Sequence, residues 1–307
     1  MSGGPLCMPF IDVTVNAEWS DWQNYPEGRP NPIYSQQVID YNLDGLILGF
    51  ITLSTSNTAC WASQPTMHLD WALPLAEDIQ KLNKKVIVSF GGASNSDIST
   101  KFSVDDLVHT YNQTITMYNA YGLDFDLENG LYNIDNICEA LVKVVASNPS
   151  IRISFTLPTM PEGLTPVSLG LVQKAKDSDL VVTVNGMAMD YYQGETVDMG
   201  AKAIQTIDSI KSQLQTLYPS ESEVVCYSRT AITPMIGLND DLSMFTIPDS
   251  TSVGQYCLSK SIAFVSFWDL NRDNPSYFTY VDLNSSSNPH QQKSGDYSKA
   301  FVEAILK

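Results

Sequence analysis

Short apolar runs recur along the chain, and stretches of helical periodicity separate them. Several of these runs are continuous and rich in Val, Ile and Phe, as in Val86–Phe90. Such runs are typical of parallel strands that are buried on both faces. The eight runs interpreted as strands are Pro9–Val15, Leu46–Leu53, Lys85–Gly91, Gly122–Glu128, Ile151–Pro158, Leu180–Asp190, Val224–Ile232 and Ile262–Leu270.

Apolar residues three and four apart between these runs predict amphipathic helices. The clear helical patterns are Leu75–Leu82, Leu107–Tyr118, Ile137–Val145, Ile204–Leu217 and Tyr297–Ile305, and the weaker ones are Ile33–Tyr41, Ser168–Lys176 and Asp249–Lys260. Repeated strand–helix alternation predicts a (β/α)8 TIM barrel, with a doubly wound sheet as the alternative. No GxGxxG motif follows the first strand, which weakens the dinucleotide-binding version of that alternative. We find no linker or repeat, so we expect a single domain over residues 1–307.

The run Tyr121–Glu128 alternates apolar and acidic residues. Residues two apart share one face of a strand, so Asp124, Asp126 and Glu128 point the same way and the apolar residues point the other way. One interpretation is an edge strand whose acidic face is wet. In a barrel, however, this face lies inside and Glu128 lies at the carboxyl end of the strand, where barrel active sites occur. Burying three carboxylates together is costly, which favours a catalytic role.

Composition narrows the possible partners. The chain has 17 basic and 34 acidic residues and a formal net charge of -17, which argues against binding nucleic acid or an anionic membrane surface. No run of 18 apolar residues is present, so we expect no transmembrane helix, and no signal peptide is visible at the start. The five cysteines form no CxxC pair and the three histidines are isolated, so we expect no metal site and no cofactor.

Four motifs, in order along the chain, resemble glycoside hydrolase family 18. The fourth predicted strand resembles the family's DGxDxDxE signature at Gly122, Asp124, Asp126 and Glu128, whereas Tyr121 stands where the family usually has Asp. The other three are Ser89–Gly92, which matches SxGG, Met187–Tyr191, which looks like MxYD, and Ser266–Asp273, which resembles the eighth strand. Two further segments, Ser154–Pro158 and Thr233–Gly237, look like a bacterial-type subgroup of its chitinases.

This resemblance implies a retaining mechanism in which the substrate's own 2-acetamido oxygen attacks the anomeric carbon and forms an oxazolinium intermediate. Glu128 would be the general acid and then the base for water. Asp126 would orient the acetamido N–H and stabilise the developing positive charge, and Asp124 would share a proton with Asp126. Carboxylates this close titrate as a coupled set.

The resemblance also implies sugar-binding residues. Asp190 would lie near the reacting sugar, and Trp268 would stack on its apolar face. The family often has a Tyr at the position of Met189, whose hydroxyl holds the acetamido group, and a thioether cannot replace that hydroxyl. Tyr191 or Tyr227 would then supply it. The further substrate-binding candidates are Met187, Phe10 and Trp61, with core packing as the alternative for Phe10, Trp61 and Tyr227, and the support residues are Ser89, Gly91 and Gly92.

The activity that the resemblance implies is endo-hydrolysis of β-1,4-linked N-acetylglucosamine polymers, so the expected partners are chitin or N-acetylglucosamine oligosaccharides. Fewer than thirty residues separate Pro234 from Ile262. This leaves no room for the α+β insertion that walls the cleft in some members, and we expect an open groove. The alternatives are an endo-β-N-acetylglucosaminidase acting on N-glycans and a non-catalytic chitin-binding lectin, although such lectins typically lack the final Glu. The resemblance suggests an extracellular protein.

Overall fold

A computed structural model of the protein describes residues 4–306. Its main sheet follows the order β1-β13-β10-β9-β7-β6-β5-β3-β2, with parallel pairing between neighbours. The outermost strands, β1 (Leu6–Cys7) and β2 (Phe10–Asp12), are two halves of one chain segment, which pairs with β13 on one side and with β3 on the other. The sheet therefore closes on itself, and the predicted eight-stranded barrel is confirmed.

The remaining barrel strands lie close to the predicted runs. They are β3 (Gly45–Leu53), β5 (Lys85–Gly91), β6 (Gly122–Asp126), β7 (Arg152–Met160), β9 (Thr183–Ala188), β10 (Thr230–Pro234) and β13 (Phe264–Val265). Short antiparallel additions lie at their ends: β4 (Ala59–Trp61) on β3, β8 (Gly163–Leu164) on β7, and the hairpin of β11 (Gly237–Leu238) and β12 (Met244–Phe245).

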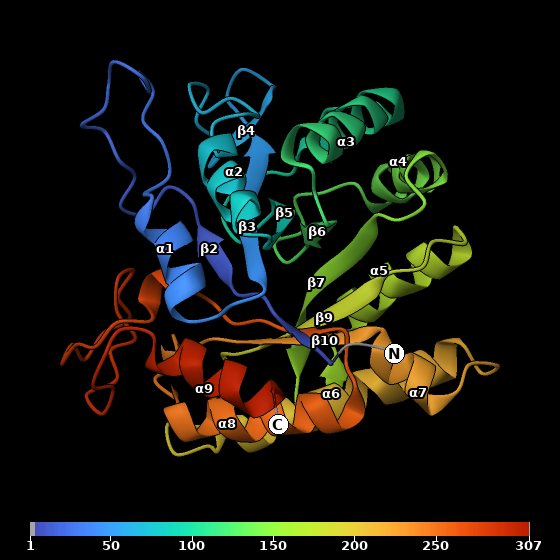
Figure 1. Ribbon diagram of the computed structural model, residues 1–307. Coiled ribbons are helices and arrows are strands. Elements are labelled where there is room, and N and C mark those ends of the chain that lie inside the picture. Colours follow the sequence, from blue (N-terminus) through green and yellow to red (C-terminus); the bar gives the residue numbers. More distant parts are fainter. Residues whose placement is uncertain (1–3, 307) are drawn as a thin grey trace.

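Helices surround the barrel (Figure 1). They are α1 (Ile33–Asp40), α2 (Leu73–Lys81), α3 (Val104–Tyr118), α4 (Ile134–Ser147), α5 (Pro166–Asp177), α6 (Met199–Leu217), α7 (Glu223–Ser228), α8 (Ile247–Lys260) and α9 (Asp296–Ile305), with 3-10 turns η1 (Ile98–Thr100) and η2 (Leu270–Arg272). None of the described helices is both long enough and apolar enough to span a bilayer. The connection from β10 to α8 holds only the β11–β12 hairpin, so the expected absence of an α+β insertion is confirmed.

Two predicted strands are partly wrong. Residues Glu223–Ser228 form helix α7, because the Ser222 hydroxyl accepts a hydrogen bond from the Val225 N–H at 3.3 Å and caps the helix. The barrel strand begins only at Thr230. In the last predicted strand, Ile262–Leu270, regular pairing covers Phe264–Val265, and the chain then turns into η2 where Asp269 caps it.

The barrel interior has an apolar part and a polar part, and both differ from the outer core. The apolar interior cluster contains Met8, Phe10, Ile47, Ile87, Ala231 and Phe264. Hydroxyl, amide and carboxyl groups from β5, β6, β7, β9 and β10 form the polar part. On the outer face, Phe125 packs against Tyr111 of α3 with ring centroids 5.3 Å apart. The expected outward packing of the apolar side of β6 is confirmed.

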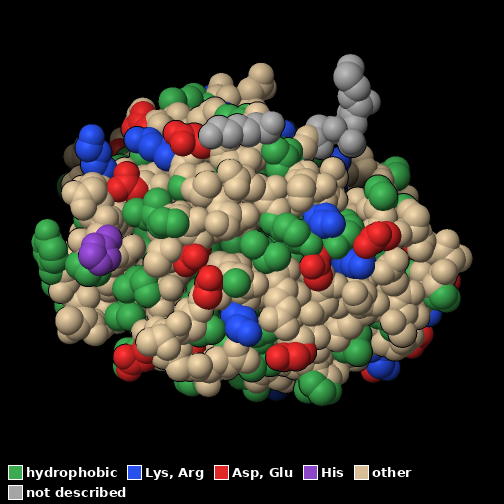
Figure 2. All heavy atoms as spheres, turned by 90° about the horizontal axis from the view of Figure 1, so that it is seen from below, with side chains coloured by type: hydrophobic (Ala, Val, Ile, Leu, Met, Phe, Trp, Pro, Cys, Tyr) green, Lys and Arg blue, Asp and Glu red, His purple; other side chains and the backbone are tan. Residues whose placement is uncertain are grey.

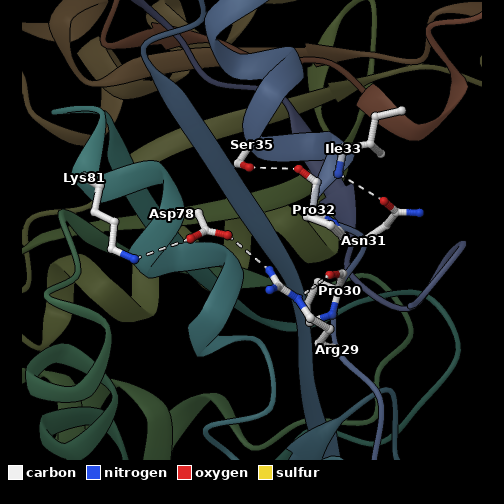
Figure 3. Close-up of polar contacts among 8 residues, drawn as sticks. All are labelled: Arg29, Pro30, Asn31, Pro32, Ile33, Ser35, Asp78 and Lys81. Atoms are coloured by element: carbon white, nitrogen blue, oxygen red, sulfur yellow. Dashed lines mark hydrogen bonds and ion pairs between the residues drawn. The ribbon is translucent and has the colours of Figure 1, made fainter. Parts of the chain in front are cut away.

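Two long loops, residues 13–32 and 274–295, follow β2 and η2 and lie on the same side of Figure 1. Figure 3 shows how the first is held: Arg29 contacts Asp78 of α2 at 3.1 Å, and Lys81 contacts the other oxygen of Asp78 at 3.6 Å. The second is held by the buried guanidinium of Arg272, which donates to the Asp282 carbonyl at 2.8 Å. These contacts anchor the two loops to α2 and to the buried Arg272.

The face that carries α8 and α9 shows acidic and basic side chains dispersed singly among polar and apolar ones (Figure 2). The described residues on this face form no continuous basic surface of the kind that phosphate binding requires.

Candidate active site

A cavity of about 450 Å³ opens at the carboxyl ends of the barrel strands. Its residues combine acidic groups with an aromatic and thioether wall. They are Phe10, Phe50, Ala93, Asp126, Glu128, Thr156, Pro158, Thr159, Met160, Thr165, Met187, Met189, Asp190, Thr233, Met235, Asp240 and Trp268. Such a concave site, mostly apolar with a few converging polar groups, suits a ligand of sugar-like character.

Asp124 and Asp126 on β6 and Glu128 just beyond its end project into the barrel and ascend toward this cavity. Asp124 is fully buried, Asp126 is almost fully buried, and Glu128 lies two residues beyond the cavity-lining Asp126 with part of its side chain accessible. The strand ends at Asp126, so Glu128 stands at the barrel mouth. The period-two pattern thus places a buried carboxyl group below two groups that a ligand can reach.

Asp124 is held by hydroxyl groups from the neighbouring strands. Ser89 donates to one carboxylate oxygen at 2.6 Å, and Ser154 and Thr156 donate to the other at 2.6 and 2.7 Å. Burial raises the pKa of Asp124 to about 6, and the three hydroxyls oppose that rise. The family resemblance implied a proton shared with Asp126, and this stays a prediction. The hydrogen bonds of the Asp124 side chain within residues 4–306 run to these three hydroxyls, which occupy both oxygens.

Asp126 and Glu128 form a coupled pair. Burial raises the pKa of Asp126 well above its usual range, and the adjacent carboxyl groups of Glu128 and Asp124 raise it further. Burial also raises the pKa of Glu128, and the charge of Asp190 adds to that effect. One oxygen of Asp126, Oδ1, is buried without a hydrogen-bond partner among the described residues. The raised pKa values favour the protonated forms of this pair, and Oδ1 of Asp126 offers a buried acceptor for a ligand N–H or O–H.

The wall opposite these acids is aromatic. Trp268 stacks on Phe50 with ring centroids 5.8 Å apart and planes inclined by 16°, and Phe10 lies 6.0 Å from each ring. Phe10 and Trp268 were expected in the groove, whereas Phe50 was not. The sequence did contain a signal for Phe50, which is the single aromatic residue in the predicted strand Leu46–Leu53. Met187 also lines the cavity, together with Met160, Met189 and Met235.

The support residues bring β5 close to the acids. Gly91 has a φ of +101°, and a Cβ there would lie 2.2 Å from the Asp126 carbonyl oxygen. Gly92 has a φ of +94°, and a Cβ there would lie 2.9 Å from the Phe50 ring. Its N–H donates to the Asp126 carbonyl at 3.0 Å. Both glycines therefore satisfy a steric and conformational requirement that a side chain would violate.

No family model matches the chain. Two curated relatives match most of it: "Endochitinase 11" from Metarhizium anisopliae is 27% identical over 291 residues, and "Probable bifunctional chitinase/lysozyme" from Escherichia coli strain K12 is 26% identical over 289 residues. These alignments cover 88% and 87% of this chain but 53% and 31% of the relatives. The chain thus spans about half of the first relative and about a third of the second.

Among solved structures, the catalytic domain of the hyperthermophilic chitinase from Pyrococcus furiosus is similar along the whole chain. The TM-score is 0.86 and the identity 26%, with 99% of this chain and 97% of that domain covered. A glycoside hydrolase family 18 chitinase from the fern Peteris ryukyuensis shares the fold, with a TM-score of 0.60 at 16% identity. In sequence and fold, the chain is similar to chitinases of glycoside hydrolase family 18. The motifs on β6 and β9 and around Trp268 contribute residues to the same cavity, and the motif on β5 directly precedes the cavity-lining Ala93.

Three residues that were expected to bind sugar lie outside the cavity. Trp61 is fully buried in the outer core, where its indole N–H contacts the Leu69 carbonyl at 3.0 Å. Tyr227 lies on α7, before β10, and donates to Asp208 of α6 at 2.7 Å. The Tyr191 hydroxyl is buried 2.7 Å from Thr206 Oγ1 of α6.

The side-chain hydroxyl groups in this cavity come from threonines. Within the described part of the chain, no tyrosine lines it, so neither candidate replaces the hydroxyl missing at Met189. The threonines that line the cavity are Thr156, Thr159, Thr165 and Thr233. Among the same residues, no group of three or more His, Cys, Asp or Glu side chains is arranged to hold a metal ion.

Asp190 lines the cavity and also joins two loops. Its side chain accepts a hydrogen bond from the Asp240 N–H at 2.7 Å, and its own N–H donates to Asn239 at 3.2 Å. Burial and the charge of Asp240 raise the pKa of Asp190 to about 6. When it ionises, Asp190 therefore adds negative charge beside Glu128.

We expect Asp190→Asn to lower the pKa of Glu128, because it removes a like charge while retaining an acceptor for Asp240. A general acid must be protonated, so the alkaline limb of the kcat/KM profile should move to lower pH. The measurement is the hydrolysis of chitin oligomers between about pH 4 and 9, which brackets the carboxyl groups with raised pKa values. An unmoved alkaline limb would contradict the electrostatic coupling.

Proposed function

We propose that this protein is a retaining endo-chitinase that cleaves β-1,4-linked N-acetylglucosamine polymers. One observation carries the proposal: Glu128 stands at the mouth of the cavity, above the buried Asp124 and Asp126 and opposite the Trp268 wall. The names of the relatives support the substrate class. A mutant of the Pyrococcus furiosus chitinase complexed with chito-oligosaccharides, 26% identical with a TM-score of 0.86, supports it as well.

In the proposed reaction, Glu128 gives its proton to the glycosidic oxygen while the substrate's acetamido oxygen attacks the anomeric carbon. The C–O bond to the leaving sugar breaks, and an oxazolinium ion forms. Water then attacks the anomeric carbon, and the bond from that carbon to the acetamido oxygen breaks. Glu128 takes the proton from this water and becomes the acid again. The net configuration is retained because two displacements occur at the same carbon.

The geometry of Asp126 suits its part in this reaction. Its unpartnered Oδ1 is an acceptor that the acetamido N–H would satisfy, and this bond would orient the acetamido oxygen toward the anomeric carbon. The pKa values of Asp126 and Glu128 are both raised by burial, which favours a protonated carboxyl group that can give its proton to the leaving group. Trp268 would support the apolar face of the reacting sugar.

The open mouth favours internal cutting. Only the short β11–β12 hairpin separates β10 from α8, so no added domain closes the groove over the chain. A polymer can therefore enter along its length. A fungal endo-β-N-acetylglucosaminidase of family 18 shares the fold at 11% identity, and this likeness carries no argument about the substrate of the present protein. The other alternative is a non-catalytic chitin-binding lectin. Such lectins typically lack the final Glu of the motif, whereas this chain has Glu128.

The test is a product profile from N-acetylglucosamine oligomers of increasing length, with the anomeric form read before mutarotation. We expect shorter oligomers from internal cleavage, initially in the β configuration. A high-mannose glycoprotein is the parallel substrate. Cleavage of the glycoprotein alone would replace this proposal by the N-glycan activity, and the absence of products from both would overturn it.

A further inference from the structure

Asn185 on β9 lies in the polar half of the barrel interior and is fully buried. Its amide joins two strands that flank β9. The nitrogen donates to Thr156 Oγ1 of β7 at 2.9 Å, and the oxygen accepts from Thr233 Oγ1 of β10 at 2.8 Å. Asn185 is not among the residues that line the cavity, so it stands behind the site.

The hydrogen bonds of this group run in one direction. Thr156 has a single hydroxyl proton, and its oxygen lies 2.7 Å from Asp124 and 2.9 Å from the Asn185 amide. Since a carboxylate only accepts, this proton serves Asp124, and the neighbour on the other side must be a donor. The NH₂ group of Asn185 is that donor, and the Thr233 hydroxyl satisfies the remaining amide oxygen. Protons therefore point from β10 through β9 and β7 toward Asp124.

We propose that Asn185 is a positioning residue for the three acids of β6: its amide turns the Thr156 hydroxyl toward Asp124 and so keeps the negative charge of the set on Asp124 and the proton on the Asp126–Glu128 pair. This inference deepens the proposed function and rests on it for its catalytic meaning. The arrangement of donors itself is a property of the fold and does not depend on the substrate.

The location of the proton matters because several acids compete for it. The acids that line the cavity above Asp124 are Asp126 at the end of β6, Glu128 just beyond it, Asp190 beyond β9 and Asp240 beyond β10. Within residues 4–306, no Lys or Arg lines it. Ser89, Ser154 and Thr156 supply the three donors to Asp124. Each donor that points at Asp124 favours its ionised form, and an ionised Asp124 favours a protonated neighbour.

Asn185→Asp is the decisive variant because it keeps the shape and removes the amide protons. A carboxylate at this position accepts from both threonines, so the Thr156 proton turns away from Asp124. Asp124 then loses a donor and gains a nearby negative charge, and both changes raise its pKa. Asn185→Leu removes the amide without adding charge, so it isolates the loss of the donor. Asn288→Asp is the matched control, since Asn288 is equally buried in the loop 274–295 and its amide contacts the Tyr297 hydroxyl at 2.8 Å.

The measurement is a ¹³C NMR titration of aspartate carboxyl groups, with the Asp124 signal assigned by its loss in Asp124→Asn. We expect the Asp124 midpoint to rise by on the order of one pH unit in Asn185→Asp, by less in Asn185→Leu, and not in Asn288→Asp. The acidic limb of kcat on chitin oligomers should move to higher pH in the same order, while KM stays unchanged because Asn185 does not line the cavity.

Unmoved Asp124 midpoints in both Asn185 variants would overturn the inference, even if activity fell, because packing loss alone does not shift a titration. Equal midpoint shifts in Asn185→Asp and Asn288→Asp would also overturn it. The NMR titration requires no turnover. If the Asp124 midpoints shift in the expected order but the protein cleaves no oligomer, the role of Asn185 is supported and only the proposed function is contradicted.

Discussion

Glu128→Gln is expected to lower kcat/KM on chitin oligomers by about 10²–10⁴-fold, the usual contribution of a positioned general acid. An amide has nearly the same shape as the carboxyl group but has no proton to give to the leaving oxygen. Substrate binding should persist, because the Trp268 wall and Asp126 are unchanged. The expected signature is therefore a large loss in kcat with KM changed little, measured by steady-state kinetics on a defined oligomer.

The fold should tolerate this change. Glu128 is partly accessible, and its charge is one of the causes that raise the pKa of Asp126, so removing it relieves repulsion within the site. The matched control is Glu139→Gln on α4, an exposed position on the outer surface that should leave activity at the wild-type level. An unimpaired Glu128→Gln enzyme would refute the assignment of the general acid.

Arg272→Met is expected to destabilise the protein by about 3–5 kcal/mol, since it leaves buried acceptors without a donor. The guanidinium donates to the carbonyls of Ile236, Leu238 and Asp282 at 2.7, 2.9 and 2.8 Å. These carbonyls belong to two loops that meet beside the cavity. Burial lowers the pKa of Arg272 and the adjacent Asp269 opposes that effect, so the charge is retained. A methionine fills similar volume but supplies no N–H.

The free energy of unfolding should be measured by urea denaturation, with Arg152→Met as the control. Arg152 is exposed, and its guanidinium stacks over the Tyr121 ring at 4.2 Å, so its loss should cost no more than about 1 kcal/mol. Equal losses in the two variants would show that the carbonyl contacts of Arg272 contribute nothing specific.

Runs of apolar residues predicted most of the barrel strands. The prediction failed where a helix-capping residue lay next to such a run. The run Val224–Ile232 looks like one strand, yet the cap at Ser222 makes its first half a helix. In this helix the Val224 side chain is 70% exposed, whereas a buried strand would cover it. Tyr227 was misplaced for this reason. Trp61 and Tyr191 lie near strand ends as expected, but their side chains turn toward the outer helices, a choice that periodicity near a strand end does not determine.

By itself, the sequence determined that Asp124, Asp126 and Glu128 share one face of one strand, because the side-chain period of a strand is two and needs no partner. Only the tertiary structure decided their surroundings. Ser89, Ser154 and Thr156 reach Asp124, and Asn185 reaches Thr156, because closure of the sheet sets the register of four strands. Phe50 meets Trp268 because the same closure brings the start and end of the chain together. Contacts between distant segments depend on how the strands align, and no local pattern encodes that alignment.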